Sequence, residues 1–339
     1  ASPKRVTPEC PNYGVCGGCS MQHGSFDEQF RIKQQVLTDN LQHLGNVVAE
    51  EIMSPLAGVP WGYRHRARLS ARYVAKKGGA LVGFREKGAP YVLDMHQCLI
   101  LPPHVSALIT PLRELVSAVS IRDKIPQIEV AVGTQVTILV IRNMEALNPE
   151  DEQLIRQFIE QYSSLENPLQ IWLQPKGPET CYPFYPVDAP KLSYTIQRFS
   201  LDMPYNPSEF TQVNPYINEE MLALSMELLA PQTHEVIADF FCGIGNFTLP
   251  MARLAKQVVG IEGADALVKR AKQNAIHNGL GDKVAYQVCN LFTIDDVWLQ
   301  KLGHFDKWLI DPPRDGAFEL VKSITPQTAP KRIVYVSCN

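Results

Sequence analysis

The sequence predicts an α/β fold in which a parallel sheet with helices on both faces is joined to a mainly β region. Three observations support this prediction. From about residue 206 onward, helical patterns alternate with short apolar strands, as in a parallel sheet. Between about residues 48 and 201, short apolar or alternating runs are broken by Gly, Pro and Asn, which is typical of β structure. A glycine-rich turn directly follows the first strand of the alternating half, where a ligand can approach backbone amides.

Length and composition indicate an ordinary globular protein of two or three domains. The chain has 339 residues, of which 45% are apolar and 20% charged, and its formal net charge is −3. No apolar stretch approaches the length of a membrane span, and the first residues lack the apolar core of a signal peptide. We therefore expect a cytoplasmic protein without a membrane partner, and we predict no obligatory protein partner.

The first half begins with a Cys/Gly/Pro-rich loop over residues 1–23. A helix follows, with Ser25 and Glu28 as a capping box at its start and Gly45 as its stop. The β region then contains one amphipathic helix, around residues 149–163, among strands at 67–74, 127–132, 135–141 and 168–174.

The second half contains the alternating series. Helices are predicted at 218–229, 246–254 and 264–278, and strands at 234–240, 257–261, 284–288, 307–310 and 332–336. We expect four segments. These are a cysteine loop (1–23) belonging to the central domain, a helical segment (24–47) packing on the α/β domain, a central β-rich domain (48–205) and the α/β domain (206–339).

The glycine-rich turn, Asp239–Phe247, does not follow the dinucleotide fingerprint, because residue 248 is threonine instead of the third glycine. Polar residues follow the next strands in order. Glu262 can accept hydrogen bonds from a ribose diol, Asn290 can approach an adenine edge, and Asp311-Pro312-Pro313-Arg314 follows a later strand. Each acid alone could be a helix cap, but together they predict a cofactor site.

These segments carry a resemblance to a known family. Asp239–Phe247, Asp311–Arg314 and Tyr335–Asn339 resemble motifs of the RNA uracil-5-methyltransferase family, and Phe210–Asn214 is similar to a further block of that family. The resemblance implies a class I, Rossmann-like methyltransferase domain and S-adenosyl-L-methionine as cofactor. It implies Cys338 as nucleophile and Asp311 near the target base. The implied cofactor contacts are Gln212, Phe241, Gly243, Gly245, Asn246, Glu262, Asn290 and Asp311.

The chemistry of methylation at uracil C5 explains why a cysteine nucleophile is needed. C5 of uracil is too weak a nucleophile to attack the methyl group directly, and a thiolate that adds to C6 makes C5 nucleophilic. A lone cysteine at a strand end is more often a small buried hydrophobe. Here we expect Cys338 and Asp311 to lie at neighbouring strand ends, beside the methyl donor. We therefore expect a reactive Cys338 with a lowered pKa.

This sequence departs from the family pattern at both ends. Members usually continue beyond the Ser-Cys-Asn motif with further strands and a glutamate base, so that base is expected beyond Asn339. Relatives often carry a small β-barrel RNA-binding module before the cysteine loop, whereas this sequence begins a few residues before that loop, at Val6-Thr7-Pro8-Glu9-Cys10.

Four of the eight cysteines predict a metal centre: Cys10, Cys16, Cys19 and, after a long interval, Cys98. Four thiolates suit a structural zinc or a [4Fe–4S] cluster, and spacing leaves both open. The resemblance favours the [4Fe–4S] cluster with a structural role. We interpret Cys181, Cys242 and Cys289 as ordinary core residues.

A basic stretch from Arg64 to Lys87 with interleaved aromatics predicts an RNA surface, although a solvated hairpin face is the plain alternative. The first candidates for RNA contact are Arg64, Arg66, Arg68, Arg72, Lys77 and Phe210. The cysteine spacing and Gly62-Tyr63-Arg64 resemble the family branch that acts on uridine 1939 of 23S rRNA, which makes 23S rRNA the expected partner. A dual-site 23S enzyme remains open, and the tRNA branch lacks the cysteines. Two alternative functions of a different class stay open: an amino-group methyltransferase, and a non-catalytic iron–sulfur RNA-binding protein.

Overall fold

The computed structural model describes residues 2–337. The chain divides into two compact units, one formed by residues 1–191 with 211–217 and the other by residues 192–210 with 218–339. Among residues 2–337, none of the helices combines the length and apolar character that a membrane crossing requires.

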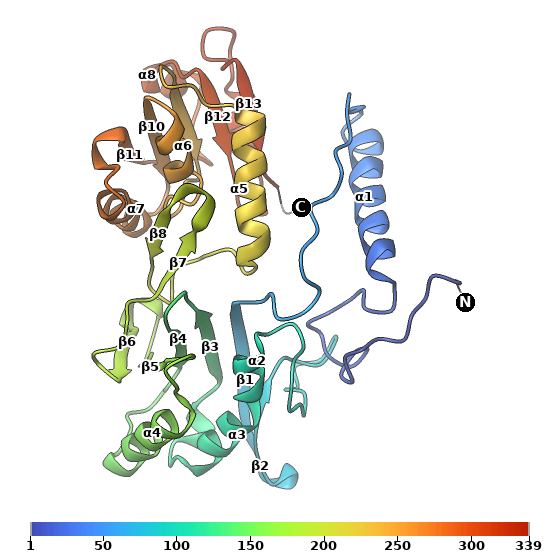
Figure 1. Ribbon diagram of the computed structural model, residues 1–339, viewed down its shortest axis with the longest axis vertical. Helices are drawn as coiled ribbons and strands as arrows, with labels where there is room; N and C mark the ends of the chain where they lie inside the picture. Colours follow the sequence, from blue (N-terminus) through green and yellow to red (C-terminus); the bar gives the residue numbers. More distant parts are fainter. Residues whose placement is uncertain (1, 338–339) are drawn as a thin grey trace. The chain divides into compact units, whose positions relative to one another are not determined.

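The first unit is built on a six-stranded mixed sheet in the order β2-β1-β3-β4-β5-β6 (Figure 1). Only β4 and β5 run parallel to each other. The alternation of buried and exposed residues along β1 explains why this segment forms a half-buried strand. The strands are β1 (Arg66–Val74), β2 (Gly79–Gly83), β3 (Gln127–Val132), β4 (Thr137–Ile141), β5 (Leu169–Leu173) and β6 (Tyr182–Tyr185).

Helices contribute more to the first unit than the sequence predicts. α4 (Pro149–Tyr162) confirms the expected amphipathic helix, and Asn148 begins it by accepting a hydrogen bond from the N–H of Asp151. The expectation that this is the single helix of the region is wrong, because α2 (Pro103–Ala107) and α3 (Ile109–Ala118) precede it. The buried face of α3 packs into the same core as the buried face of the sheet. Residues 48–65, expected to be part of the β region, contain no strand.

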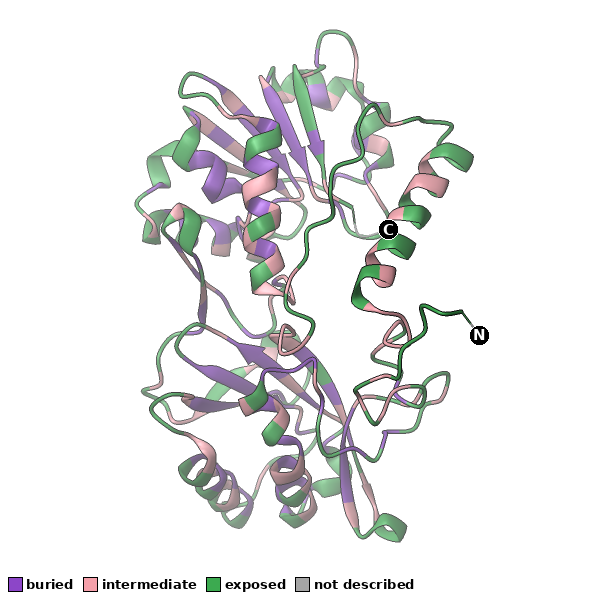
Figure 2. Cartoon of the chain, turned by 45° about the vertical axis from the view of Figure 1, so that its right-hand side comes forward, coloured by how far each residue is buried: buried purple, intermediate pink, exposed green. Residues whose placement is uncertain are grey.

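The helix α1 (Phe26–His43) forms where a helix was predicted, with the Ser25 hydroxyl accepting from the N–H of Glu28. None of its residues is buried, as the green and pink colouring in Figure 2 shows. Its predicted packing on the α/β domain stays a prediction.

The second unit carries a five-stranded parallel sheet in the order β11-β10-β9-β12-β13. This confirms the predicted α/β pattern. The strands are β9 (Val236–Phe240), β10 (Gln257–Glu262), β11 (Val284–Val288), β12 (Lys307–Ile310) and β13 (Arg332–Tyr335). A separate antiparallel pair, β7 (Ser193–Ile196) and β8 (Leu201–Pro204), belongs to the same unit.

Both faces of the parallel sheet are covered, which explains why its central strands are continuous apolar runs. One face packs with residues of α5 (Pro215–Leu229), α6 (Thr248–Leu254) and α7 (Asp265–His277), and the other with α8 (Asp296–Leu302) and α9 (Phe318–Lys322). The helices α8 and α9 were not predicted. Trp308 and Phe240, whose ring centroids lie 4.9 Å apart, fill the core beneath α8 and α9.

Candidate functional site

The loop between β9 and α6 has the backbone geometry of a ligand-binding turn. Gly243 and Gly245 have φ values of 54° and 96°, which glycine adopts without strain. Phe241 has a φ of 64°, a conformation that is uncommon and strained for a bulky residue and that is found mainly at functional sites. The loop is anchored from beneath, because the buried side chain of Asn274 donates to the carbonyl of Ile244 at 3.1 Å.

Asp239, the acid at the start of this loop, has no exposed surface. Burial raises its pKa to about 8, opposed by a hydrogen bond from the Thr248 hydroxyl and reinforced by the charges of Asp311 and Glu262. The effect of these two acids on Asp239 means that all three carboxyl groups lie close together. This is the clustering that the sequence predicts at the carboxyl ends of the strands.

Glu262, at the end of β10, connects two turns. One carboxylate oxygen accepts from the N–H of Gly243 at 3.1 Å, and the other accepts from the N–H of Ala264 at 3.0 Å. Each carboxylate oxygen can accept a second hydrogen bond. The side chain therefore holds the glycine loop and keeps acceptor capacity for a ligand hydroxyl.

Asn290 follows β11, as expected. Its side-chain oxygen accepts from the N–H of Phe292 at 3.1 Å, and the Phe292 ring lies 5.6 Å from the Phe241 ring, measured between centroids. Phe292 is 44% exposed. Phe292 was not among the predicted site residues, although an aromatic residue two positions after a strand-end asparagine was a usable signal.

Asn246 was predicted to contact the cofactor, but its side-chain amide is hydrogen-bonded within the protein. Its amide pairs reciprocally with the amide of Asn218 in α5, at 3.0 and 2.9 Å, and its oxygen also accepts from the Tyr194 hydroxyl at 3.0 Å. These contacts join the glycine loop to α5 and β7. A direct contact of Asn246 with a cofactor stays a prediction.

Asp311 follows β12, and burial raises its pKa to about 6. Because β9 lies between β10 and β12 in the sheet, the glycine loop, Glu262 and Asp311 lie at the same edge. The N–H of Val336 donates to the carbonyl of Ile310 at 2.9 Å, so the chain is still paired beside β12 two residues before Cys338. Cys338 itself lies outside the described residues.

Two predicted site residues lie in the segment that leads into α5. Phe210 belongs to the second unit and is 71% exposed. Gln212 belongs to the short segment 211–217 that groups with the first unit. The predicted roles of both residues remain predictions.

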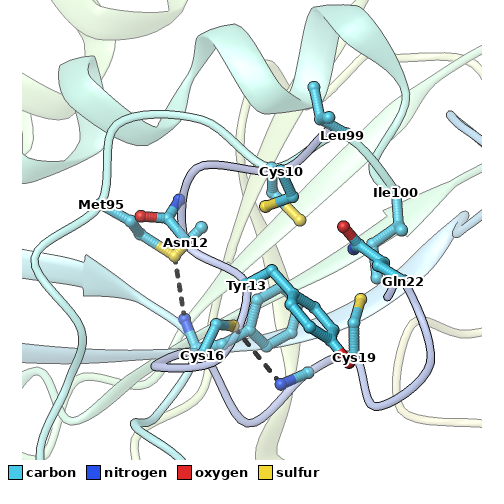
Figure 3. Close-up of a pocket in the computed structure, with 12 residues that line it drawn as sticks. Cys10, Asn12, Tyr13, Cys16, Cys19, Gln22, Met95, Leu99 and Ile100 are labelled. Carbon is cyan, nitrogen blue, oxygen red and sulfur yellow. Dashed lines mark hydrogen bonds between the residues drawn. The ribbon is translucent and has the colours of Figure 1, made fainter. Parts of the chain in front are cut away.

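The four predicted metal ligands, Cys10, Cys16, Cys19 and Cys98, line one pocket in the first unit, and Figure 3 shows three of them around it. Burial raises the pKa of the Cys98 thiol to about 11, with smaller contributions from the charges of Cys19 and Cys10. Within the described part of the chain, no three His, Cys, Asp or Glu side chains are grouped closely enough to hold a single metal ion. The pocket lining includes no charged side chain.

The N-terminal loop that carries these cysteines is attached to the basic stretch by its backbone. The N–H of Gly17 donates to the carbonyl of Arg85 at 2.9 Å, and the N–H of Lys87 donates to the carbonyl of Val15 at 2.7 Å. Cys16 and Glu86 form an isolated β-bridge.

The basic residues of β1 share one face, because Arg66, Arg68 and Arg72 alternate with buried Ala67, Leu69 and Ala71. Two of the predicted RNA contacts are already paired with acids in the first unit. Arg68 forms a salt bridge with Glu129 at 3.0 Å, and Lys77 lies 3.7 Å from Asp94.

Arg64, a predicted RNA contact, is partly buried. Its Nε is buried without a hydrogen-bond partner, and its charge lowers the pKa of Cys19, which burial raises overall. Arg64 therefore lies close to Cys19, which lines the cysteine pocket.

Known proteins match this chain at two levels: a family profile matches most of the second unit, and whole-protein relatives match nearly all of the chain. The sequence profile of a family described as tRNA (Uracil-5-)-methyltransferase matches residues 192–339. The chain is 58% identical to the 23S rRNA (uracil(1939)-C(5))-methyltransferase RlmD of Chromobacterium violaceum, over 99% of this chain and 65% of that relative. It therefore spans just under two thirds of that protein's length. It is 53% identical to the RlmD of Nitrosospira multiformis, over 99% of this chain and 75% of that relative.

The fold also matches a solved structure, that of Pyrococcus abyssi tRNA (uracil-54, C5)-methyltransferase in complex with S-adenosyl-L-homocysteine. The TM-score is 0.72 at 21% sequence identity, and the match covers 100% of this chain and 77% of that chain. At this identity the likeness shows the fold alone. It confirms the predicted methyltransferase fold class.

Proposed function

The chain belongs to the family of 23S rRNA (uracil(1939)-C(5))-methyltransferases named RlmD, and on that premise we propose that it methylates C5 of a uridine in 23S rRNA. The target is uridine 1939, as the names of the relatives state for those proteins. The methyl donor is S-adenosyl-L-methionine, whose product S-adenosyl-L-homocysteine is bound in the Pyrococcus abyssi structure. The observation that carries the proposal is the clustering of the glycine loop, Glu262 and Asp311 at one edge of the parallel sheet.

Each part of this edge suits a portion of the cofactor. The glycine loop lets the donor approach backbone N–H groups. Glu262 has acceptor capacity for the ribose hydroxyls beyond its bonds to Gly243 and Ala264. The rings of Phe241 and Phe292 offer apolar faces for the adenine next to Asn290.

The chemistry runs through the thiolate of Cys338. The thiolate adds to C6 of the uracil, and the electron pair of the C5–C6 double bond moves toward the O4 carbonyl as an enolate. C5 then attacks the methyl carbon, and S-adenosyl-L-homocysteine leaves with the bonding electrons. A base removes the C5 proton, the double bond re-forms, and the thiolate leaves C6. Asp311, whose pKa burial raises to about 6, holds the uracil ring through hydrogen bonds in this proposal.

The test uses the full-length protein, S-adenosyl-L-methionine and unmodified 23S rRNA, with 5-methyluridine mapped by mass spectrometry. Wild-type protein is expected to methylate uridine 1939. Cys338→Ala is expected to form no detectable product, while Cys181→Ala, the same change at a half-buried cysteine of the first unit, keeps wild-type activity. Product at full yield from Cys338→Ala would contradict the nucleophile, and methylation at a second uridine would identify a dual-site enzyme.

We further propose that Cys10, Cys16, Cys19 and Cys98 hold a [4Fe–4S] cluster. Four thiols lining one pocket without competing charges suit such a cluster. A cluster spreads its cysteines over different irons, whereas a single zinc ion draws four sulfurs to about 2.3 Å from one centre. The choice of the cluster over zinc rests on the resemblance of the cysteine spacing to the iron–sulfur branch of the family. The cluster would fix the N-terminal loop against the basic stretch and takes no part in methyl transfer.

Metal analysis after anaerobic purification tests this assignment. We expect iron and acid-labile sulfide in equal amounts, with the broad visible absorbance of an iron–sulfur protein. Cys16→Ser is expected to lose both, and Cys289→Ser, which changes a cysteine of the second unit, is expected to retain both. One zinc per chain and no sulfide would contradict the cluster.

A further inference from the structure

A concave pocket in the first unit brings three arginines together. Arg72, Arg85 and Arg122 line it, with Tyr73 among the other lining residues. The Arg85 Nε donates to the Ser70 hydroxyl at 3.3 Å. The Arg122 guanidinium lies over the Tyr73 ring, 4.3 Å from its centroid. Neutral groups therefore position two of the three guanidiniums.

The positive charge of this pocket is largely uncompensated. Asp123 is the one acid among the lining residues. In residues 2–337, none of the three guanidiniums lies within salt-bridge distance of a carboxylate, in contrast to Arg68 with Glu129 and Lys77 with Asp94. The three arginines are also solvent-exposed. The pocket thus offers free N–H donors and positive charge to a ligand from solution.

We infer that this arginine pocket, defined by Arg72, Arg85 and Arg122, binds a backbone phosphate of the RNA substrate. The inference rests on the proposed function. The planar fork of a guanidinium matches the oxygens of a phosphate, and an arginine stacked on tyrosine keeps its N–H edges available. The N–H of Gly17 donates to the carbonyl of Arg85 at 2.9 Å, so the cysteine loop fixes the backbone of one of these arginines.

An RNA phosphate suits the pocket better than a free anion does. A phosphodiester must leave its two ester links free to continue along the strand. The exposure of all three arginines allows that. Arg85 lies in the basic stretch predicted as an RNA surface but was not among its first candidates. Arg122 lies outside that stretch, 50 residues from Arg72 in the sequence, and only the fold brings it to the pocket.

The experiment measures the affinity of the protein for a 23S rRNA fragment as a function of salt concentration, for wild type, Arg122→Gln and the double variant Arg85→Gln/Arg122→Gln. Each lost phosphate contact is expected to reduce the slope of log K against log salt by about 0.7 to 0.9. The double variant is also expected to bind about tenfold more weakly at moderate salt, with a raised KM and an unchanged kcat. Circular dichroism checks that both variants are folded.

The matched control is Arg156→Gln, since Arg156 also lies over an aromatic ring, 4.8 Å from the Tyr185 centroid, but lies outside the pocket. Its salt slope is expected to equal that of the wild type. Unchanged slopes in the pocket variants, with wild-type methylation intact, would overturn the inference and leave the proposed function standing. Absence of methylation by the wild type would instead contradict the proposed function.

A second arm separates RNA from a free anion. Inorganic pyrophosphate is added and the melting temperature is measured for the same proteins. If the pocket variants lose a pyrophosphate-induced stabilisation but keep the wild-type salt slope for RNA, the pocket is a free-anion site and the RNA assignment is wrong.

Discussion

Asp239 illustrates how burial alters the chemistry of one residue. The side chain has no exposed surface, and one of its oxygens has no hydrogen-bond partner. Burial raises its pKa from 3.8 to about 8. The folded protein therefore retains a proton on Asp239 at pH values at which the unfolded chain has lost it.

This difference predicts how the stability of the second unit depends on pH. Because the folded pKa is the higher one, the stabilisation is fully present below pH 4 and is lost as the pH rises toward 8. Relative to Asp239→Asn, which cannot titrate, the wild type is expected to lose at most about 1.4 kcal/mol of unfolding free energy per pH unit in this interval. The unfolding free energy of the second unit is measured at each pH by hydrogen exchange of β9 and β12 amides in increasing urea, without cofactor. Parallel pH curves for the two proteins would contradict the burial argument.

At the scale of secondary-structure elements, the site depends on contacts that hold the glycine loop to its neighbours. Asn246 in the loop pairs with Asn218 in α5, which is 4% exposed, and accepts from Tyr194 in β7. The packing of the strands adds a further constraint. A methyl group on Gly260 in β10 would come within 2.7 Å of the Tyr286 ring and 3.0 Å of the Cys242 sulfur. The loop is therefore held by hydrogen bonds to α5 and β7, and close packing at Gly260 in β10 fixes the position of Cys242 in the loop.

The Asn218–Asn246 pair gives a prediction for cofactor binding. Asn218→Ala leaves the buried amide of Asn246 partly unsatisfied, which costs about 1 to 3 kcal/mol. We expect about tenfold weaker binding of S-adenosyl-L-homocysteine by calorimetry. Ser225→Ala, which removes another buried polar group of the same helix, is the control and should bind normally. Equal affinity in both variants would show that α5 does not support the loop.

At the scale of the whole molecule, the two predicted centres belong to different units. The four cysteines that line the pocket are in the first unit, and the glycine loop, Glu262 and Asp311 are in the second. Each unit has its own apolar core, one under the mixed sheet and the others on the two faces of the parallel sheet. Loss of one centre should therefore act mainly on its own unit.

Hydrogen exchange tests this independence. Removal of the proposed cluster by an iron chelator under reducing conditions is expected to increase exchange in β1, β2 and the N-terminal loop, because metal binding contributes to folding free energy. The amides of β9, β10 and β12 should keep their protection. Addition of S-adenosyl-L-homocysteine is the reciprocal control and should protect the second unit alone. Similar loss of protection in both units after chelation would contradict the division.

The sequence by itself determined the elements of the parallel sheet and the order of the polar residues at its edge. The predicted bounds of β11 and β12 agree with the structure. β12 is buried along its whole length, and a strand covered on both faces is a short apolar run bounded by turn residues. The family followed from motifs whose residues are close together in the chain. The helix α3 was missed because it lies in a largely apolar segment between strands, where the helical period of Ile109, Leu112, Leu115 and Val116 is less visible.

Only the tertiary structure decided the surroundings of individual side chains. The raised pKa of Asp239 comes first from its burial and then from the charge of Asp311, which is 72 residues away. Arg64 was expected on an RNA surface but lies beside Cys19, and the arginine pocket joins three separate segments. The physical reason is that periodicity and turn residues act over a few positions, whereas burial and charge depend on which distant segments the packed core brings together.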